Sequence, residues 1–332
     1  MLPEYAAGAR NAVRSCLGIG KSDRVAVIGD REHSDISEAM VEEASATDAE
    51  VRSWLIEEHL QRPARELPAA FADQILHFKP TASFFIASSL PGEISFRKPL
   101  LNLLCYELHC RHGHMVGIDR RLMLEGMAAD YEEIYRVTRQ VYEVVKPASR
   151  IEVQTRLGTE LVATFSPQLR WVPCDGRYHE QGRWGNLPEG EVFTSPLSVD
   201  GVLAGEELGD YFAAQHGLLE EPMRFHVKAG RVIGIDSTDA VLKSEVEAYL
   251  SRHPDSNRAG EFAIGTNVAL KEITGNFLQD EKFPGVHIAF GDPYAHDTGA
   301  DWECPTHIDV LASRATVTVD GRPLMEDGRF LL

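Results

Sequence analysis

The segments "DRVAVIGD" (23–30) and "SDISEAMVEEASATDA" (34–49) determine the architecture of the first half of the chain. The first segment is a short apolar run, rich in β-branched residues and closed by Gly and Asp, which predicts a buried strand. The second has apolar residues at helical spacing, and Ser34 or Asp35 is the expected N-cap. A strand followed directly by a helix is the repeating unit of a parallel sheet.

This alternation continues to about Pro147. Repeated strand–helix units place helices on both faces of a parallel sheet. We therefore expect an α/β protein in which residues 1–147 form a doubly wound parallel sheet. Further strands are predicted over 50–58, 82–89 and 114–118, and further helices over 67–78, 95–112 and 122–146.

The sequence pattern changes after Pro147. From there the chain shows alternating strands, glycine-containing turns and few helices, which is typical of antiparallel sheets. The closing segment contains "DGR" twice, a hairpin-like turn signal. We expect residues 148–332 to form a second, β-rich α+β domain.

Composition narrows the class of protein. The 332 residues carry a net charge of 33 − 51 = −18, which argues against nucleic acid or an anionic membrane as a partner. The five cysteines are odd in number and scattered, as expected for reduced thiols in a cytosol. The N-terminus lacks a signal-peptide pattern, and no apolar run approaches the roughly 20 residues that span a bilayer. The expected location is the cytoplasm.

Several common motifs are absent or incomplete. The segment "GIGKSD" (18–23) has Ser15 where a phosphate loop needs its first glycine, and it precedes a strand. No glycine-rich dinucleotide fingerprint or serine-hydrolase elbow is present. The run "CYELHCRHGH" (105–114) has no second Cys/His pair at zinc-ribbon spacing. We expect a structural role for it, with contact between one His and a substrate as the alternative.

The second half instead places polar residues inside or beside predicted strands. His307 and Asp309 are two residues apart in "THIDV", so on a strand both point to the same face. Burying such residues singly is costly, whereas several on one sheet can satisfy each other through a cation. Taken singly, each also fits a hydrogen-bonded core histidine or a strand-edge carboxylate. The candidate ligands for one or two Zn, Co, Mn or Fe ions are Glu191, Glu261, His287, Tyr294, His307 and Asp309.

The motifs around these residues resemble those of the aminopeptidase T family of metallo-aminopeptidases. They are "NLPEGEVFTSP" (186–196), "GEFAIGTN" (260–267), "GNFLQDEKFPGVHIAFGDPY" (275–294) and "THIDV" (306–310). The resemblance implies that the family's six metal ligands fall on the six residues named above. It also implies a homodimer. Full-length peptidases of this family are longer than this chain, and a shorter branch includes iron-dependent dioxygenases that cleave dihydroxypyridine rings.

The resemblance therefore implies two chemistries. The first is a hydrolase that removes N-terminal residues from small peptides through a metal-activated water, with Glu191 or Glu261 carrying the proton and Glu189 or Asp292 as further candidate bases. The second is a mononuclear Fe(II) dioxygenase of small hydroxylated pyridine-type rings, with Glu261, His307 and Asp309 as ligands. Retention of Glu191, His287 and Tyr294 argues against the second. A scaffold protein without turnover is the third interpretation.

Overall fold

The computed structural model describes residues 3–209 and 211–332. It contains two compact units. The first unit takes the chain up to Tyr135 together with Gly176–Glu189, and the second comprises Arg136–Asp175 and Gly190–Leu332. The units therefore do not follow the single division predicted at residue 147, because the chain passes between them after Tyr135, Asp175 and Glu189.

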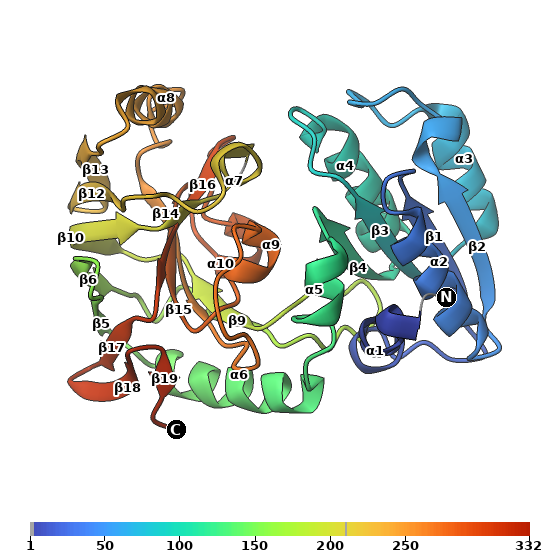
Figure 1. Cartoon of the computed structure of the whole chain (residues 1–332), viewed down its shortest axis with the longest axis horizontal. Coiled ribbons are helices and arrows are strands. Elements are labelled where there is room, and N and C mark those ends of the chain that lie inside the picture. The colour runs from blue at the N-terminus through green and yellow to red at the C-terminus, as the bar shows by residue number, and fades with distance from the viewer. Residues whose placement is uncertain (1–2, 210) are drawn as a thin grey trace. The chain divides into compact units, whose positions relative to one another are not determined.

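The first unit contains the predicted parallel sheet, with strand order β2-β1-β3-β4-β8. Figure 1 shows strands β1 to β4 of this sheet. Strands β1 and β3 are almost entirely buried, which explains their unbroken apolar sequences. The short strand β8, from the second half of the chain, extends the sheet beside β4 and was not predicted. The strands are β1 (Arg24–Gly29), β2 (Glu50–Leu55), β3 (Ala82–Ala87), β4 (Arg111–Val116) and β8 (Trp184–Asn186).

The helices of this unit follow the prediction with shorter limits. The N-cap of α2 is His33 rather than Ser34 or Asp35, and the Asp35 carboxylate accepts a hydrogen bond from the Tyr5 hydroxyl instead. The helix predicted over 122–146 is two helices, because the Asp130 carboxylate caps a new start by accepting from two backbone N–H groups. The helices are α1 (Ala6–Arg10), α2 (Ser34–Ser45), α3 (Ala69–Phe78), α4 (Ile94–Leu101) and α5 (Arg120–Leu124), with π-helical turns at Asn11–Cys16 and Asn102–Glu107 and 3-10 turns at Pro3–Tyr5 and Ile56–Glu58. Helix α6 (Tyr131–Val145) begins in this unit and belongs to the second unit from Arg136 onward.

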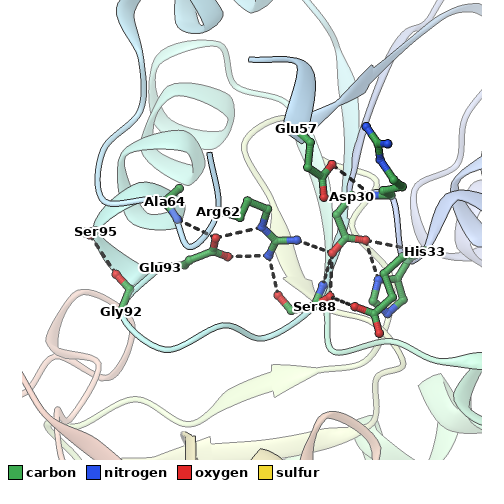
Figure 2. Close-up of polar contacts among 11 residues, drawn as sticks. Asp30, His33, Glu57, Arg62, Ala64, Ser88, Gly92, Glu93 and Ser95 are labelled. Carbon is green, nitrogen blue, oxygen red and sulfur yellow. Dashed lines mark hydrogen bonds and ion pairs between the residues drawn. The ribbon is translucent and has the colours of Figure 1, made fainter. Parts of the chain in front are cut away.

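Ion pairs fill the edge of this sheet where the strand order reverses, the usual ligand position in doubly wound folds. The Arg62 guanidinium bridges Asp30, which follows β1, and Glu93 (Figure 2). Ser88, which follows β3, donates to Asp30 through both its backbone N–H and its hydroxyl. His33 Nδ1 lies 2.7 Å from the other Asp30 oxygen. These side chains bind one another, so we interpret the network as structural.

The second unit consists of two antiparallel sheets that pack face to face. One has the order β13-β12-β10-β6-β5-β17-β18-β19 and the other the order β11-β16-β15-β14-β9-β7. Phe225 of β12 stacks on Phe290 of β15 with ring centroids 5.8 Å apart, in a core to which both sheets contribute. The predicted β-rich α+β character of this part of the chain is confirmed. In the described residues, no helix is both long and apolar enough to cross a bilayer.

The elements of the second unit have the following bounds. The eight-stranded sheet contains β5 (Arg150–Gln154), β6 (Glu160–Thr164), β10 (Ser198–Gly205), β12 (Met223–Lys228), β13 (Arg231–Asp236), β17 (Thr316–Val319), β18 (Arg322–Glu326) and β19 (Arg329–Phe330). The six-stranded sheet contains β7 (Val172–Cys174), β9 (Glu191–Thr194), β11 (Glu207–Leu208), β14 (Ala259–Gly265), β15 (Gly285–Gly291) and β16 (His307–Ser313). The helices are α7 (Tyr211–His216), α8 (Ala240–Leu250), α9 (Phe277–Asp280) and α10 (Ala295–Thr298).

Candidate metal centre

Strand register places four of the predicted ligands on one face of the six-stranded sheet. Ala289 in β15 pairs with Glu261 in β14 on one side and with Asp309 in β16 on the other. His287 precedes Ala289 by two residues and His307 precedes Asp309 by two, so all four side chains share that face. Figure 1 shows the three strands side by side in the middle of the second unit.

Glu191 joins the same face from the neighbouring strand. It begins β9 and pairs with Gly265, the last residue of β14. The alternate residues of β14, β15 and β16, among them Phe262, Ile288 and Val310, belong to the apolar core between the sheets. One face therefore anchors the sheet, while the other collects carboxylates and imidazoles around the small Ala289 side chain.

The side-chain distances fit a shared cation better than direct hydrogen bonds. His307 Nε2 lies 3.3 Å from Glu261 Oε2 and 3.4 Å from Asp309 Oδ1. His287 Nε2 lies 3.6 Å from Glu191 Oε2 and 3.8 Å from Glu261 Oε1. These separations exceed ordinary hydrogen-bond lengths. Two ligands that each lie about 2.1 Å from one ion in tetrahedral geometry are themselves about 3.4 Å apart.

A backbone carbonyl fixes the orientation of His307. Its Nδ1 lies 3.0 Å from the carbonyl oxygen of Asp292, so the N–H at Nδ1 donates to that carbonyl. Nε2 is the nitrogen that faces Glu261 and Asp309. A metal-binding imidazole commonly has this second hydrogen bond, which sets its tautomer and ring plane.

Charge in the cluster favours ionised carboxylates. Burial raises the pKa of the Glu261 carboxyl, but His287 and His307 outweigh burial and lower that pKa to about 2. Burial lowers the pKa of the His287 imidazole, yet Glu261 and Glu191 raise it to about 9. Desolvation likewise lowers the pKa of His307, and the charge of Asp309 holds it well above its ordinary value. A carboxylate-rich site of this kind attracts positive charge.

Two buried atoms at the cluster have no hydrogen-bond partner among the described residues. They are Nδ1 of His287 and Oε2 of Glu191. Unpaired buried polar atoms are rare and call for an explanation such as a bound ion or water. Together with the nitrogen and oxygen donor set, they make the site fit a divalent transition metal or zinc.

Sequence reasoning did not single out Glu281 and Lys282, which also lie at this cluster. Lys282 is fully buried, and its Nζ lies 2.6 Å from Glu191 Oε1 and 2.8 Å from Glu281 Oε1. Burial raises the pKa of the Glu281 carboxyl to about 8, although the Lys282 charge lowers it. The run of three charged residues in "QDEKF", shortly before the apolar strand β15, was the available signal.

The sixth predicted ligand, Tyr294, is the most exposed of the set at 40%. Its ring centroid lies 4.7 Å from that of His307 and 5.7 Å from that of Phe193. Its backbone is left-handed, with φ of 49°, a conformation that is rare for an aromatic residue and often marks functional positions. Tyr294 therefore packs beside His307, and its assignment as a ligand stays a prediction.

The other side chains considered from the sequence have structural contacts. Glu189 accepts from the Tyr178 hydroxyl, and the Asp292 carboxylate accepts from the backbone N–H of Tyr294. His112 and His114 contact each other at 3.1 Å between ring nitrogens, and burial lowers the pKa of both imidazoles. These contacts agree with the structural role expected for the 105–114 run.

Comparison with known proteins agrees with the layout of this site. The family model described as thermophilic metalloprotease (M29) matches residues 121–315, well over half of the chain, and includes all six predicted ligands. No curated protein matches the chain.

Two solved structures share the fold. Wild-type AmpT from Thermus thermophilus superposes with a TM-score of 0.75 at 17% sequence identity, covering 99% of each chain. The 2,5-dihydroxypyridine dioxygenase from Pseudomonas putida KT2440 superposes with a TM-score of 0.69 at 15% identity, covering 98% of this chain and 96% of the other. Both matches extend over nearly the whole length of the chain, and a dihydroxypyridine dioxygenase is among them, in line with the branch that the sequence indicated.

Proposed function

Because the chain belongs to the thermophilic metalloprotease (M29) family, we propose that it is a metal-dependent aminopeptidase-like hydrolase that removes N-terminal residues from small peptides. The single observation that carries this proposal is the convergence of Glu261, His287, His307 and Asp309 on one sheet face at 3.3–3.8 Å spacings. Glu191 and Tyr294, which complete the peptidase-like set, are retained beside them.

The proposed ligands are Glu261, His307 and Asp309, with His287 adjoining them. A divalent metal held by these residues would lower the pKa of a bound water and polarise a carbonyl oxygen. The Asp292 carbonyl keeps His307 in the tautomer that presents Nε2. Glu261 is ionised at neutral pH because its pKa is about 2, so it is ready to act as a ligand.

Glu191 is the proposed proton carrier. Its Oε1 accepts from Lys282, while its Oε2 is buried, has no hydrogen-bond partner among the described residues and lies 3.6 Å from His287 Nε2. One oxygen is thus anchored and the other is available to take a proton from the attacking water and return it to the leaving amine. Anchoring by Lys282 holds this geometry before substrate binds.

The carboxylates of the cluster provide acceptors for a substrate with a free α-amino group. Glu191, Glu261, Glu281 and Asp309 are the carboxylates concerned, and Lys282 pairs with two of them. Carboxylate oxygens form charge-assisted hydrogen bonds with a cationic amine. This supports cleavage at the N-terminal end of a peptide.

Activity and metal binding measured together test this function. Purified protein reconstituted with Zn, Co or Mn is expected to release leucine from a leucyl peptide. Glu191→Gln is expected to lower kcat by about 10²–10⁴-fold, the usual contribution of a proton carrier, while the protein still binds metal. His307→Ala is expected to lose both metal and activity. Full activity in Glu191→Gln would exclude its proposed role.

The second candidate is an Fe(II) dioxygenase of a hydroxylated pyridine-type ring. Glu261, His307 and Asp309 form a carboxylate–imidazole set of the type that holds mononuclear iron. The fold shared with the Pseudomonas dioxygenase is compatible with this reaction. Oxygen uptake with a dihydroxypyridine in iron-loaded protein, with no release of leucine under any metal, would replace the peptidase by this candidate.

A further inference from the structure

Two groups of candidate ligands share His287. One comprises Glu261, His287 and Asp309, and the other comprises Glu191, Glu281 and His287. In each group the ligand atoms lie within 4.8 Å of one another. The sheet face therefore offers two adjacent cation positions. They differ because only the second group also contacts a positively charged side chain of the protein.

Lys282 contributes positive charge to the second group. Its ammonium lies 2.6 Å from Glu191 Oε1 and 2.8 Å from Glu281 Oε1, so it is bound to two of the three ligands. The Lys282 side chain has no exposed surface. Lysine is almost never fully buried unless it is paired, and a buried ammonium that loses its carboxylates is strongly disfavoured.

We propose that Lys282 serves as the built-in cation of the second position, so that the protein binds a single divalent ion at the Glu261–His307–Asp309 side of the face. A second divalent ion between Glu191 and Glu281 would have to displace the buried Lys282 ammonium, which has no exposed surface. If the ammonium stayed in place, the two positive charges would repel each other. Glu191 is then a carboxylate held by Lys282 rather than a metal ligand.

This inference rests on the proposed function in one respect, namely that the first group binds a metal ion. It adds the number of ions and the role of Lys282 as a positioning residue for Glu191. Both can be measured through metal binding, independently of turnover.

The test is the stoichiometry of Co²⁺ binding to the full-length protein after removal of metals with a chelator. The wild type is expected to bind one ion per chain. Lys282→Asn removes the ammonium and is expected to bind two, the second with at least about tenfold weaker affinity. The double variant Lys282→Asn/Glu191→Gln is expected to return to one. Lys228→Asn, which changes a lysine side chain that is 72% exposed, is the matched control and is expected to bind one.

Each result has a defined meaning. Two ions in the wild type, reduced to one by Glu191→Gln, would overturn the inference and leave the proposed function standing. One ion in a folded Lys282→Asn protein would also overturn it. No ion in the wild type would overturn both the inference and the proposed function. Should Lys282→Asn fail to fold, one ion in both the wild type and Glu191→Gln supports the inference, because Glu191 is then not a ligand.

Discussion

The hydroxyl group of Tyr249 makes two hydrogen bonds to the backbone of His307. It accepts from the His307 N–H at 3.1 Å and donates to the His307 carbonyl at 2.9 Å. Tyr249 lies in α8 and is 3% exposed. Its two hydrogen bonds therefore connect this helix to the first residue of β16. This contact positions a proposed metal ligand from outside the sheet.

We therefore expect Tyr249→Phe to weaken metal binding without touching the metal site directly. Loss of such a supporting contact typically costs 10–100-fold in metal affinity. The unpaired His307 backbone groups should also lower the free energy of unfolding by about 1–3 kcal/mol. Titration with Co²⁺ and denaturant unfolding measure the two effects. Tyr106→Phe, at a residue that is 47% exposed, is the control. Equal metal affinity in Tyr249→Phe and wild type would remove the positioning role.

Ala289 provides a steric test of the shared sheet face. It pairs with both Glu261 and Asp309 and is fully buried. Ala289→Leu should fill the space between the two carboxylates, abolish metal-dependent thermal stabilisation and leave every proposed ligand in place. Overpacking also costs about 1–3 kcal/mol of stability, so the comparison is the shift in Tm on adding metal rather than Tm itself. A wild-type shift in the variant would show that metal binds elsewhere.

The sequence predicts which residues gather on this sheet face better than it predicts the residues that support them. His307 and Asp309 were placed on one face by strand periodicity, and the strand register confirms that placement. Tyr249 is distant in sequence from His307, and Lys282 is distant from Glu191. The local sequence around each is that of an ordinary helical or loop residue. Tertiary partners of this kind leave no periodic signal.

The strands of the first sheet show the same contrast between elements that their own sequence predicts and elements that depend on contacts distant in sequence. The β-branched run at 24–29 has a clear local signal and forms β1. Strand β8 at Trp184–Asn186 is three residues long and joins a sheet whose other strands lie far earlier in the chain. Nothing local distinguishes such a segment from a loop, so its pairing follows from tertiary contacts alone.

A substitution at Tyr294 can separate a role of the phenol oxygen as a metal ligand or substrate contact from a role of the ring in packing. Tyr294→Phe retains the ring beside His307 and Phe193 but removes the phenol oxygen. If the phenol is a ligand or contacts substrate, kcat/KM should fall by about tenfold or more, since one such interaction is worth about 1.4 kcal/mol. Stability should change by less than about 0.5 kcal/mol at this exposed position. Unchanged kinetics and unchanged metal affinity would assign Tyr294 to packing only.

Glu207 is expected to make the free energy of unfolding fall as pH rises. Burial, followed by the charge of Asp280, raises the pKa of the Glu207 carboxyl from 4.5 to about 10. A raised pKa stabilises the folded protein below the unfolded value, and that stability is lost as pH rises from about 4.5 toward 10. Glu207→Gln cannot ionise, so its stability relative to wild type should improve with pH, by at most about 1.4 kcal/mol per pH unit. Unfolding in denaturant at pH 6 and pH 8 measures this, with the exposed Glu247→Gln as control. A constant difference between the two pH values would contradict the prediction.

Arg62 tests whether the polar network of the first unit is structural. Its guanidinium bridges the buried carboxylates of Asp30 and Glu93. Removing one partner of a buried ion pair leaves uncompensated charge and typically costs about 3–5 kcal/mol. We expect Arg62→Ala to lower the free energy of unfolding by that amount, whereas Arg65→Ala, at an exposed residue three positions along, should change it by less than about 0.5 kcal/mol. Metal stoichiometry should be the same in both, because the proposed ligands all lie in the second unit. A folded and fully stable Arg62→Ala protein with altered substrate affinity would instead assign this network to ligand binding.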